Sequence, residues 1–421
     1  MGNNYEVWIV YTKGKELSLC NPFPMKIKTL FLLMAGWFYP VFTFSQHHLT
    51  FTQQSIQLKK HLSFQLKVPT GYKIAVAAEG LKRPRFFAKS PDGRLFITDM
   101  QDRSDNKKGK VLILENWNEQ EKRFETVTTF LEGLHNPNQV AFYTANNQHY
   151  IYIAETGKLS YYRYTPESHY PSSDPVVIAV FPDYGLDYKY GGWHLTRSLA
   201  IHNNKLYVSV GSSCDACIEK EEIRATIVEM DPSGRNQKFY ARGLRNAVGM
   251  KWVDNQLWVT NMGRDNRGPD KPEDLFHTIE AGGCYGWPYY FQFRKQIVAD
   301  TAFRDSVRPA YVTQPAVAPW SFKAHSAPLG FDHFTGFGDS LLNNSFLVAL
   351  HGSTSVWRQR GNAVVQMLPD GSCREVVAGF LQGKTESKRM GRPCDVMQWD
   401  NHSFFISDDK NGVIYYVWKQ Q

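Results

Sequence analysis

The feature of this sequence that most constrains its fold is a unit of two short apolar strands that recurs six times. Each unit opens on a polar residue, runs through a few apolar residues to a turn, and continues into a second apolar strand. The six units begin at Arg85, Asn138, Arg197, Asn246, Ser326 and Arg392, at spacings of 53, 59, 49, 80 and 66 residues. Repeats of about this period are typical of propellers. The sequence therefore predicts an all-β, six-bladed β-propeller, with a two-sheet sandwich as the alternative.

The rest of the chain agrees with an all-β fold. From Phe64 onward, short runs of β-branched and aromatic residues alternate with clusters of Gly, Pro, Asn and Asp, and no long segment has helical periodicity. A hydrophobic content of 42% is enough to bury a large core. We therefore expect residues 65–421 to form a single propeller domain, and residues 46–64 to be a loose lead-in.

The N-terminus resembles a targeting segment. Residues 25–46 read MKIKTLFLLMAGWFYPVFTFSQ, two lysines followed by an apolar run that a proline interrupts. This is the layout of a secretory signal peptide, and it is short for a membrane span. We expect residues 1–45 to be a leader, with Met25 as an alternative start, and the mature protein to be periplasmic or secreted without a membrane span. An uncleaved N-terminal anchor is the alternative.

The net charge and the cysteines limit the classes of ligand, metal and cofactor that the sequence favours. The net charge of +8 falls to +6 when the four Lys and two Glu of residues 1–45 are left out, and no Lys/Arg block appears, which argues against nucleic acid and favours a small anionic ligand. Cys214 and Cys217 suit a local disulfide, since zinc would need a second pair and haem attachment would need His at position 218. Cys373 with Cys394 is a weaker candidate pair, which leaves Cys284 unpaired.

The starts of the repeats are expected to meet in one place, because equivalent loops of all blades of a propeller converge on one face. Together with the nearby His194, Arg245 and His351 they predict a polar, cationic central site. Gly263 lies in a Gly- and Asp-rich loop whose carbonyls suit a hard cation such as Ca²⁺. The alternatives are a buried, hydrogen-bonded His194, a salt bridge at Arg245 and a solvated surface loop.

Several segments together resemble the soluble, pyrroloquinoline-quinone (PQQ)-dependent glucose/sorbosone, or aldose sugar, dehydrogenase family over residues 65–420. They are WHLTRSLAIHNNKLYVSVGS (193–212), GLRNAVG (243–249), NMGRD with GGCYGWP (261–288), PWSFKAHSAPLGF (319–331), ALHGS (349–353) and GRPCDV (391–396). The resemblance implies a six-bladed propeller that oxidises an aldose at its anomeric hydroxyl, with hydride transfer to PQQ assisted by Ca²⁺. It also implies a sugar substrate and an electron acceptor, either a cytochrome or a quinone.

The resemblance assigns roles to individual residues. His194 matches the general base, and Arg245 and Asn246 match the pair that contacts the quinone oxygens. Gly263 and Arg264 fall where calcium-binding carbonyls lie, and Arg392 matches a cation that grips a cofactor carboxylate. Trp320 aligns with an aromatic residue beside the cofactor ring, with core packing as the alternative; His351 lies nearest the position of a cofactor lysine; and His135 and Asn138 map loosely onto a substrate contact.

The chain departs from the family pattern at three of these positions. Arg264 replaces the proline of the glucose-oxidising members, Cys394 stands where a second carboxylate-binding arginine is expected, and no lysine matches His351. Lys323, Arg358 or Arg85 could supply the missing charge. Two other functions therefore stay open, a non-enzymatic propeller that binds a carbohydrate or protein, and a Ca²⁺-dependent sugar lactonase.

Overall fold

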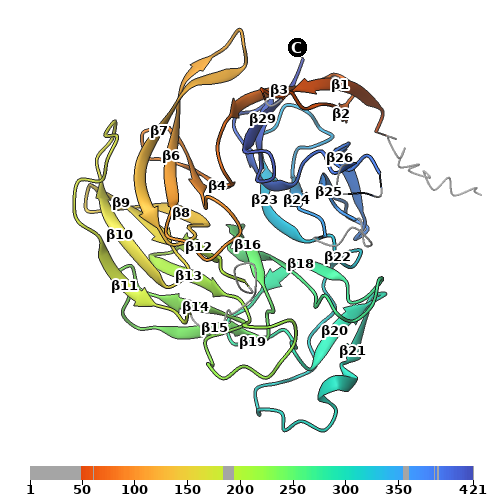
Figure 1. Cartoon of the computed structure of the whole chain (residues 1–421). Helices are drawn as coiled ribbons and strands as arrows, with labels where there is room; N and C mark the ends of the chain where they lie inside the picture. Colours follow the sequence, from red (N-terminus) through yellow and green to blue (C-terminus); the bar gives the residue numbers. More distant parts are fainter. Residues whose placement is uncertain are drawn as a thin grey trace, which may run out of the picture. The chain divides into compact units, whose positions relative to one another are not determined.

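Six sheets, five of four antiparallel strands and one with a fifth, parallel strand, are arranged around a central axis in the computed structural model (Figure 1). The structure describes residues 49–59, 61–183, 194–353, 360–383, 385 and 388–420. The proposed leader, Trp193 and Arg358 lie outside the described residues. The fold is a six-bladed β-propeller, as the repeats predict.

The first three blades follow one another along the chain. Blade 1 consists of β4 (Pro84–Lys89), β5 (Leu95–Asp99), β6 (Gly109–Asn118) and β7 (Arg123–Leu134). Blade 2 consists of β8 (Gln139–Ala145), β9 (Gln148–Ala154), β10 (Lys158–Tyr164) and β11 (Val176–Val180). Blade 3 consists of β12 (Arg197–His202), β13 (Lys205–Val210), β14 (Thr226–Met230) and β15 (Lys238–Arg242), with β19 (Gly283–Cys284) parallel to β15.

The last three blades complete the ring. Blade 4 consists of β16 (Ala247–Val253), β17 (Gln256–Asn261), β18 (Asp274–Ile279) and β22 (Trp320–Phe322). Blade 5 consists of β23 (Pro328–Phe334), β24 (Ser345–Leu350), β25 (Ala363–Met367) and β26 (Cys373–Val377). Blade 6 consists of β27 (Pro393–Gln398), β28 (Ser403–Asp408), β29 (Val413–Lys419) and β3 (Tyr72–Glu79).

The ring closes by pairing the two ends of the propeller sequence. The N-terminal strand β3 pairs antiparallel with the C-terminal strand β29, so blade 6 contains strands from both ends. The first strand of every repeat is the innermost strand of its blade, and each inner strand contacts the inner strands of both neighbouring blades. The six repeat starts therefore lie at one end of the central axis.

A recurring hydrogen bond holds the residue that precedes an inner strand. In four blades, a polar side chain at the end of the second strand, or directly after it, accepts from the backbone N–H of such a residue. The pairs are Asp99 with Arg83, Glu155 with His135, Asn261 with Asn246, and Asp408 with Arg392. The two ends meet because the first two strands of each blade form an antiparallel hairpin. These bonds satisfy backbone donors that would otherwise be buried without partners.

The axis itself is filled by apolar side chains below the repeat starts. The inner strands of blades 1, 4, 5 and 6 each carry a bulge near their start. Residues of these bulges form one buried cluster of Phe86, Val248, Leu329 and Cys394. Blades 1 and 4 are opposite each other in a six-membered ring, so a cluster that joins them lies on the axis. The side chain of Cys394 is therefore part of an apolar plug.

Two hairpins lie outside the blades. The segment expected to be a loose lead-in instead forms β1 (Phe51–Gln57), which pairs with β2 (Ser63–Pro69). Ile56 and Leu58 are buried against blades 5 and 6, because alternate apolar residues of this hairpin face the core. The second hairpin, β20 (Tyr290–Phe293) and β21 (Gln296–Ala299), precedes the short 3-10 helix η1 (Thr301–Phe303). Within the described residues, no helix is long and apolar enough to cross a membrane.

Candidate active site

His194 lies just before the inner strand of blade 3 and has a defined tautomer. Its Nδ1 lies 2.8 Å from the carbonyl oxygen of Ser212, so Nδ1 carries the proton and Nε2 is the basic nitrogen. Burial and the charge of Arg245 lower the pKa of His194 to about 3. The imidazole is therefore neutral at physiological pH, so Nε2 can accept a proton, but a base with this pKa is weaker than one whose pKa lies near the working pH.

The backbone and packing of His194 are unusual. Its φ is +49°, in the left-handed region that residues other than Gly rarely adopt, although His, Asn and Asp are found there more often than most. Such strain persists only where the surroundings hold it, and it clusters at functional sites. A Cβ placed on Gly211 would lie 2.6 Å from His194 Cβ and 2.9 Å from Asn246 Oδ1. The glycine at the end of β13 therefore allows His194 and Asn246 to approach each other.

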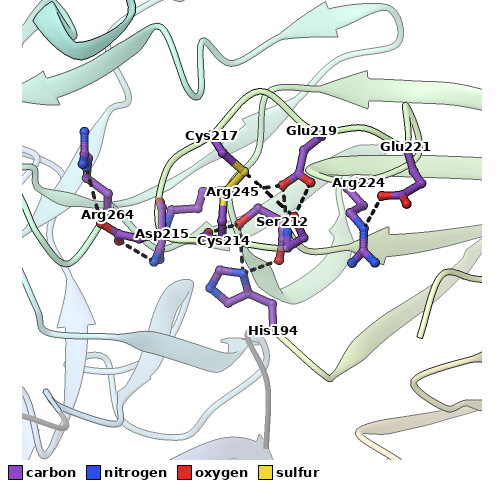
Figure 2. The surroundings of a disulfide bond; sticks show 11 residues. His194, Ser212, Cys214, Asp215, Cys217, Glu219, Glu221, Arg224, Arg245 and Arg264 are labelled. Atoms are coloured by element: carbon purple, nitrogen blue, oxygen red, sulfur yellow. Dashed lines mark hydrogen bonds and ion pairs between the residues drawn. A yellow bond between two sulfur atoms is a disulfide. The ribbon is translucent and has the colours of Figure 1, made fainter. Parts of the chain in front are cut away.

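A disulfide loop supports this histidine (Figure 2). Cys214 and Cys217 are bonded, which confirms the predicted local disulfide. Ser212, which accepts from His194, donates its hydroxyl to the carbonyl of Cys214 at 2.8 Å. Glu219 accepts from both the backbone N–H and the hydroxyl of Ser213, at 2.7 and 2.6 Å. The loop is thus fixed on both sides of the bond.

Arg245 connects the disulfide loop to the Gly-rich loop of blade 4. Its guanidinium donates to the carbonyl of Asp215 at 2.8 Å, to the carbonyl of Gly263 at 2.8 Å and to the carboxylates of Asp215 and Asp265 at 3.0 and 3.1 Å. Asp215 also accepts from the backbone N–H groups of Asp265 and Asn266. The fork of an arginine is suited to such a junction.

The loop expected to bind calcium has its Gly263 carbonyl and its carboxylates bonded to arginine side chains. The Gly263 carbonyl accepts from Arg245, and the side chain of Arg264 donates to Asp300 at 2.8 Å. Asp300 also pairs with Arg267 at 3.2 Å. Three carboxylates of the loop region, those of Asp215, Asp265 and Asp300, thus face three guanidinium groups, those of Arg245, Arg264 and Arg267. As arranged, this donor set does not fit a calcium ion, which prefers oxygen ligands with surplus negative charge.

A second group of charges gathers around Asp409 at the seam of blades 5, 6 and 1. Arg83 and Arg85 both lie 2.6 Å from Asp409 Oδ2, and His351 Nε2 lies 2.7 Å from its Oδ1. Arg392 donates through Nε to the carbonyl of His351 at 3.1 Å and through Nη2 to that of Gly352 at 2.5 Å. We call Arg83, Arg85, His351, Arg392 and Asp409 the arginine cluster.

Asn138 and His135 extend the same face to blade 2. Asn138 accepts from Arg85 Nε at 3.0 Å and donates to the hydroxyl of Ser198 at 3.1 Å, which links blades 1, 2 and 3. His135 lies in the β7–β8 loop and is bonded through Nε2 to Asp105. Asn138 is fully buried, so its role in this structure is to join blades, whereas His135 is partly exposed.

Three other predicted residues point elsewhere. Trp320 is in β22, the outermost strand of blade 4, where its indole donates to the carbonyl of Leu368 at 2.7 Å and packs between blades 4 and 5. Arg197 is fully buried and donates to the carbonyls of His194, Thr196 and Pro182. Ser326 donates to the carbonyl of Lys323. The structure thus shows the core packing that was the alternative for Trp320.

The second proposed disulfide is wrong. Cys373 is exposed on β26, whereas Cys394 is buried in the axial cluster, and both are free thiols. The two residues lie on an outer and an inner strand, so they cannot meet. Cys284 is also free, as expected.

Several residues of the site were not singled out from the sequence. Asp215 lies inside the Cys214–Cys217 loop and Asp409 directly follows β28, yet each organises one group of charges. Arg83 precedes the first repeat by two residues. Asp409 could have been found from the sequence. The second strand of an antiparallel hairpin ends beside the start of the first strand, so a residue that follows the second strand lies near the repeat start.

Buried His277 on β18 gives the protein a testable pH dependence. Burial lowers the pKa of His277 to about 4, and its Nε2 has no hydrogen-bond partner among the described residues. The unfolded chain binds a proton near pH 6.5, so this contribution to stability is complete above pH 6.5 and is lost as the pH falls to 4. By linkage, unfolding free energy should fall by about 2 kcal/mol between pH 7.5 and 5 from this residue alone.

Replacing His277 with Phe should remove that dependence, because Phe fills a similar volume and does not titrate. Urea unfolding at pH 7.5 and pH 5 would measure the free energies of the natural protein and of His277→Phe. The decrease on acidification should be smaller in the variant by about 2 kcal/mol. An equal decrease in both proteins would show that His277 is protonated without cost in the folded state.

Comparison with known proteins places the chain in a family and a fold. A family model described as "Domain of unknown function (DUF7133)" matches residues 59–278, and the chain belongs to that family. It is also similar to an uncharacterized protein of Borreliella burgdorferi, with 23% identity over 389 residues that cover 86% of this chain and 93% of that protein.

Solved structures share the propeller at low sequence identity. The calcium structure of a Trichoderma reesei carbohydrate-active enzyme of family AA12 has a TM-score of 0.68 and 17% identity, covering 84% of this chain and 96% of that one. The holo pyranose dehydrogenase PQQ domain of Coprinopsis cinerea has a TM-score of 0.64 and 15% identity, covering 84% and 97%. The apo soluble aldose sugar dehydrogenase of Escherichia coli has a TM-score of 0.57 and 14% identity, covering 83% and 99%. These likenesses show the fold.

Proposed function

We propose that this protein is a PQQ-dependent oxidoreductase that oxidises an aldose at its anomeric hydroxyl. The observation that carries the proposal is a neutral, tautomer-fixed His194 beside Arg245, at the end of a propeller where a surplus of arginine also gathers. The proteins that share the fold include a pyranose dehydrogenase PQQ domain and an aldose sugar dehydrogenase, which supports this choice of chemistry.

The charges of the arginine cluster fit a polycarboxylate cofactor. The guanidinium groups of Arg83 and Arg85 both pair with the carboxylate of Asp409, and the guanidinium of Arg392 donates only to the carbonyls of His351 and Gly352, so the cluster itself carries more positive than negative charge. Burial lowers the pKa of Arg392 to about 9, so its charge is costly without an anion. Arg83, Arg85 and Arg392 would hold carboxylates of the cofactor at this end of the axis.

The protein's own groups would carry the proton chemistry. Bound PQQ supplies the acceptor for the hydride. His194 Nε2 takes the proton of the anomeric hydroxyl, while the Ser212 carbonyl holds the imidazole orientation through Nδ1–H. Arg245 places a fixed positive charge next to this base, where it favours negative charge that develops during transfer. The apolar plug on the axis excludes water from below the site.

The resemblance implies a calcium ion, but the positive charge of Arg245, whose guanidinium lies 2.8 Å from the Gly263 carbonyl oxygen, opposes a cation at this carbonyl. We also propose that the protein acts outside the cytoplasm, on a small sugar, and passes electrons to a cytochrome or quinone. The apolar segment at residues 29–44 supports the export part of this proposal.

A titration of residues 46–421 with PQQ, with and without Ca²⁺, tests the proposal. The absorbance of the cofactor should change on binding, and the loaded protein should then oxidise aldoses with an artificial electron acceptor. Saturable sugar binding without any reduction of the acceptor would instead identify a carbohydrate-binding propeller. Hydrolysis of a sugar lactone with Ca²⁺ and no quinone would identify a lactonase.

A further inference from the structure

The position that should carry a second carboxylate-binding arginine is closed to a ligand. Cys394 is fully buried in the axial plug, where it packs with Phe86, Val248 and Leu329. Burial raises the pKa of its thiol, so the thiol brings no negative charge to the site. The charge of Arg85 acts in the opposite direction and lowers the pKa of this thiol, but burial has the larger effect.

His351 does not replace the missing lysine as a charge. Burial and the charge of Arg392 hold the pKa of His351 well below its ordinary value, so the ring is neutral. A neutral ring that lies with Nε2 2.7 Å from a carboxylate donates its single N–H to that carboxylate, here Asp409. His351 is therefore a positioning residue that orients Asp409.

Asp409 in turn fixes Arg83, which was not singled out from the sequence, and Arg85, which the sequence offered as one source of the missing charge. Its pKa is held well below the ordinary value by Arg83, His351 and Arg85, so it is a carboxylate at all physiological pH values. Arg83 and Arg85 both bind the same oxygen, Oδ2, from the loop before β4 and from β4 itself. Their side chains are 12% and 6% exposed, so neither is free to leave for bulk water.

Arg83 and Arg85 have N–H groups that do not bond to Asp409. Arg83 Nε is buried and has no hydrogen-bond partner in the described part of the chain. Asp408, the next carboxylate, is already bonded to the backbone N–H groups of Arg392 and Lys410, to Asn411 and to Tyr415. Two arginines on one carboxylate leave positive charge that a dianion or trianion would satisfy.

We propose that Arg83 and Arg85, held in place by Asp409 and His351, form with Arg392 the carboxylate-binding end of the site. The pair compensates for the arginine and lysine that Cys394 and His351 do not supply. The identity of the ligand, an aromatic polycarboxylate, rests on the proposed function. The class of anion rests only on the residues of the arginine cluster.

Binding of two probes to the natural protein and to Arg83→Gln and Arg85→Gln tests the inference. The first probe is PQQ, followed by its absorbance, and the second is benzenetricarboxylate, which is redox-inactive, followed by calorimetry. Each substitution should weaken the binding of both probes by about ten- to a hundredfold, because a charge-assisted pair is lost. The exposed Arg123→Gln on the β6–β7 turn is the control and should bind like the natural protein.

Unfolding could mimic a loss of binding, so thermal denaturation and Arg85→Lys accompany these variants. Arg85→Lys keeps the charge that balances Asp409, and it should bind each probe with an affinity between those of the natural protein and Arg85→Gln, because it loses the fork. An Arg85→Lys protein that binds no better than Arg85→Gln would overturn the charge argument.

The outcomes separate this inference from the proposed function. If the natural protein binds PQQ and both glutamine variants bind it equally well, the inference is overturned and the function stands. If the natural protein binds only benzenetricarboxylate, and the variants bind it weakly, the cluster is an anion site and the PQQ function fails. Binding of neither probe would overturn both.

Discussion

Replacing His194 with Asn should lower kcat for aldose oxidation by a factor of about 10² to 10⁴, the usual contribution of a general base. Asn is the suitable replacement because the backbone at this position has φ of +49°, which Asn adopts more readily than most residues. The variant should therefore fold normally. Because PQQ would be held by the arginine cluster, its affinity should change by less than threefold, and kcat alone should fall.

His202→Asn is the matched control. His202 ends the same strand, β12, and stacks on Trp252 at 4.2 Å, at the opposite end of the blade from the site. Its kcat should equal that of the natural protein. If His194→Asn retained full activity with a well-bound cofactor, His194 would be a structural residue and another group would have to act as the base.

The propeller was predictable because its sequence pattern has a physical cause. Every blade begins with a buried strand that opens on a polar residue at one end of the axis, so the same short pattern must recur six times. The pattern also located Arg85, Asn138, Asn246 and Arg392 at that end, where the structure has them. The resemblance to a known family added His194 and Arg245, which the structure links through Ser212: its carbonyl accepts from His194, and its backbone N–H donates to the carbonyl of Arg245.

What the pattern could not show is the direction of each side chain. Arg197 and Arg85 both open repeats, yet Arg197 turns inward to carbonyls while Arg85 binds Asp409. The difference depends on bulges in the inner strands, which move one residue onto the axis in four blades. The residue at position 394, where an arginine was expected, lies in such a bulge, and its cysteine side chain is buried in the axial cluster.

The sequence pattern also did not predict which residues bind the site residues, because these partners come from distant parts of the chain. Asp409 is 324 residues from Arg85, and Asp215 is 30 residues from Arg245. Only the return of each second strand to the same end of the propeller brings such residues together. This rule could have been applied to the sequence, because Asp99, Glu155 and Asp408 end or follow the second strand of their units.

Replacing Arg245 with Met should reduce the free energy of unfolding by about 3 kcal/mol, in addition to its effect on the site. Arg245 is 2% exposed and bonded to two carboxylates and two carbonyls, and Met fills its volume without donating to any of them. Breaking a buried pair by removing one partner leaves the other charge uncompensated. Urea unfolding would measure the loss.

Removing one of the carboxylates that Arg245 binds should restore part of the lost stability, and a second arginine serves as the control. Adding Asp215→Asn to Arg245→Met should restore about 1 kcal/mol, because Asp215 is the more buried of the two carboxylates that lose Arg245 and keeps only the 3.6 Å pair with Arg264, while Asp265 is 49% exposed and can be hydrated. Arg242→Met, at the end of β15, removes a 3.8 Å pair with the exposed Glu222 and the contacts of the guanidinium with the rings of Phe239 and Tyr311. No buried carboxylate loses its partner in this variant, so it should cost less than about 1 kcal/mol. If Arg245→Met and Arg242→Met cost the same, the links from Arg245 to Asp215, Gly263 and Asp265 would not hold the disulfide loop and the Gly-rich loop together. The Gly263 carbonyl would then be open to a cation at little cost, and calcium binding at this loop would regain its place in the mechanism.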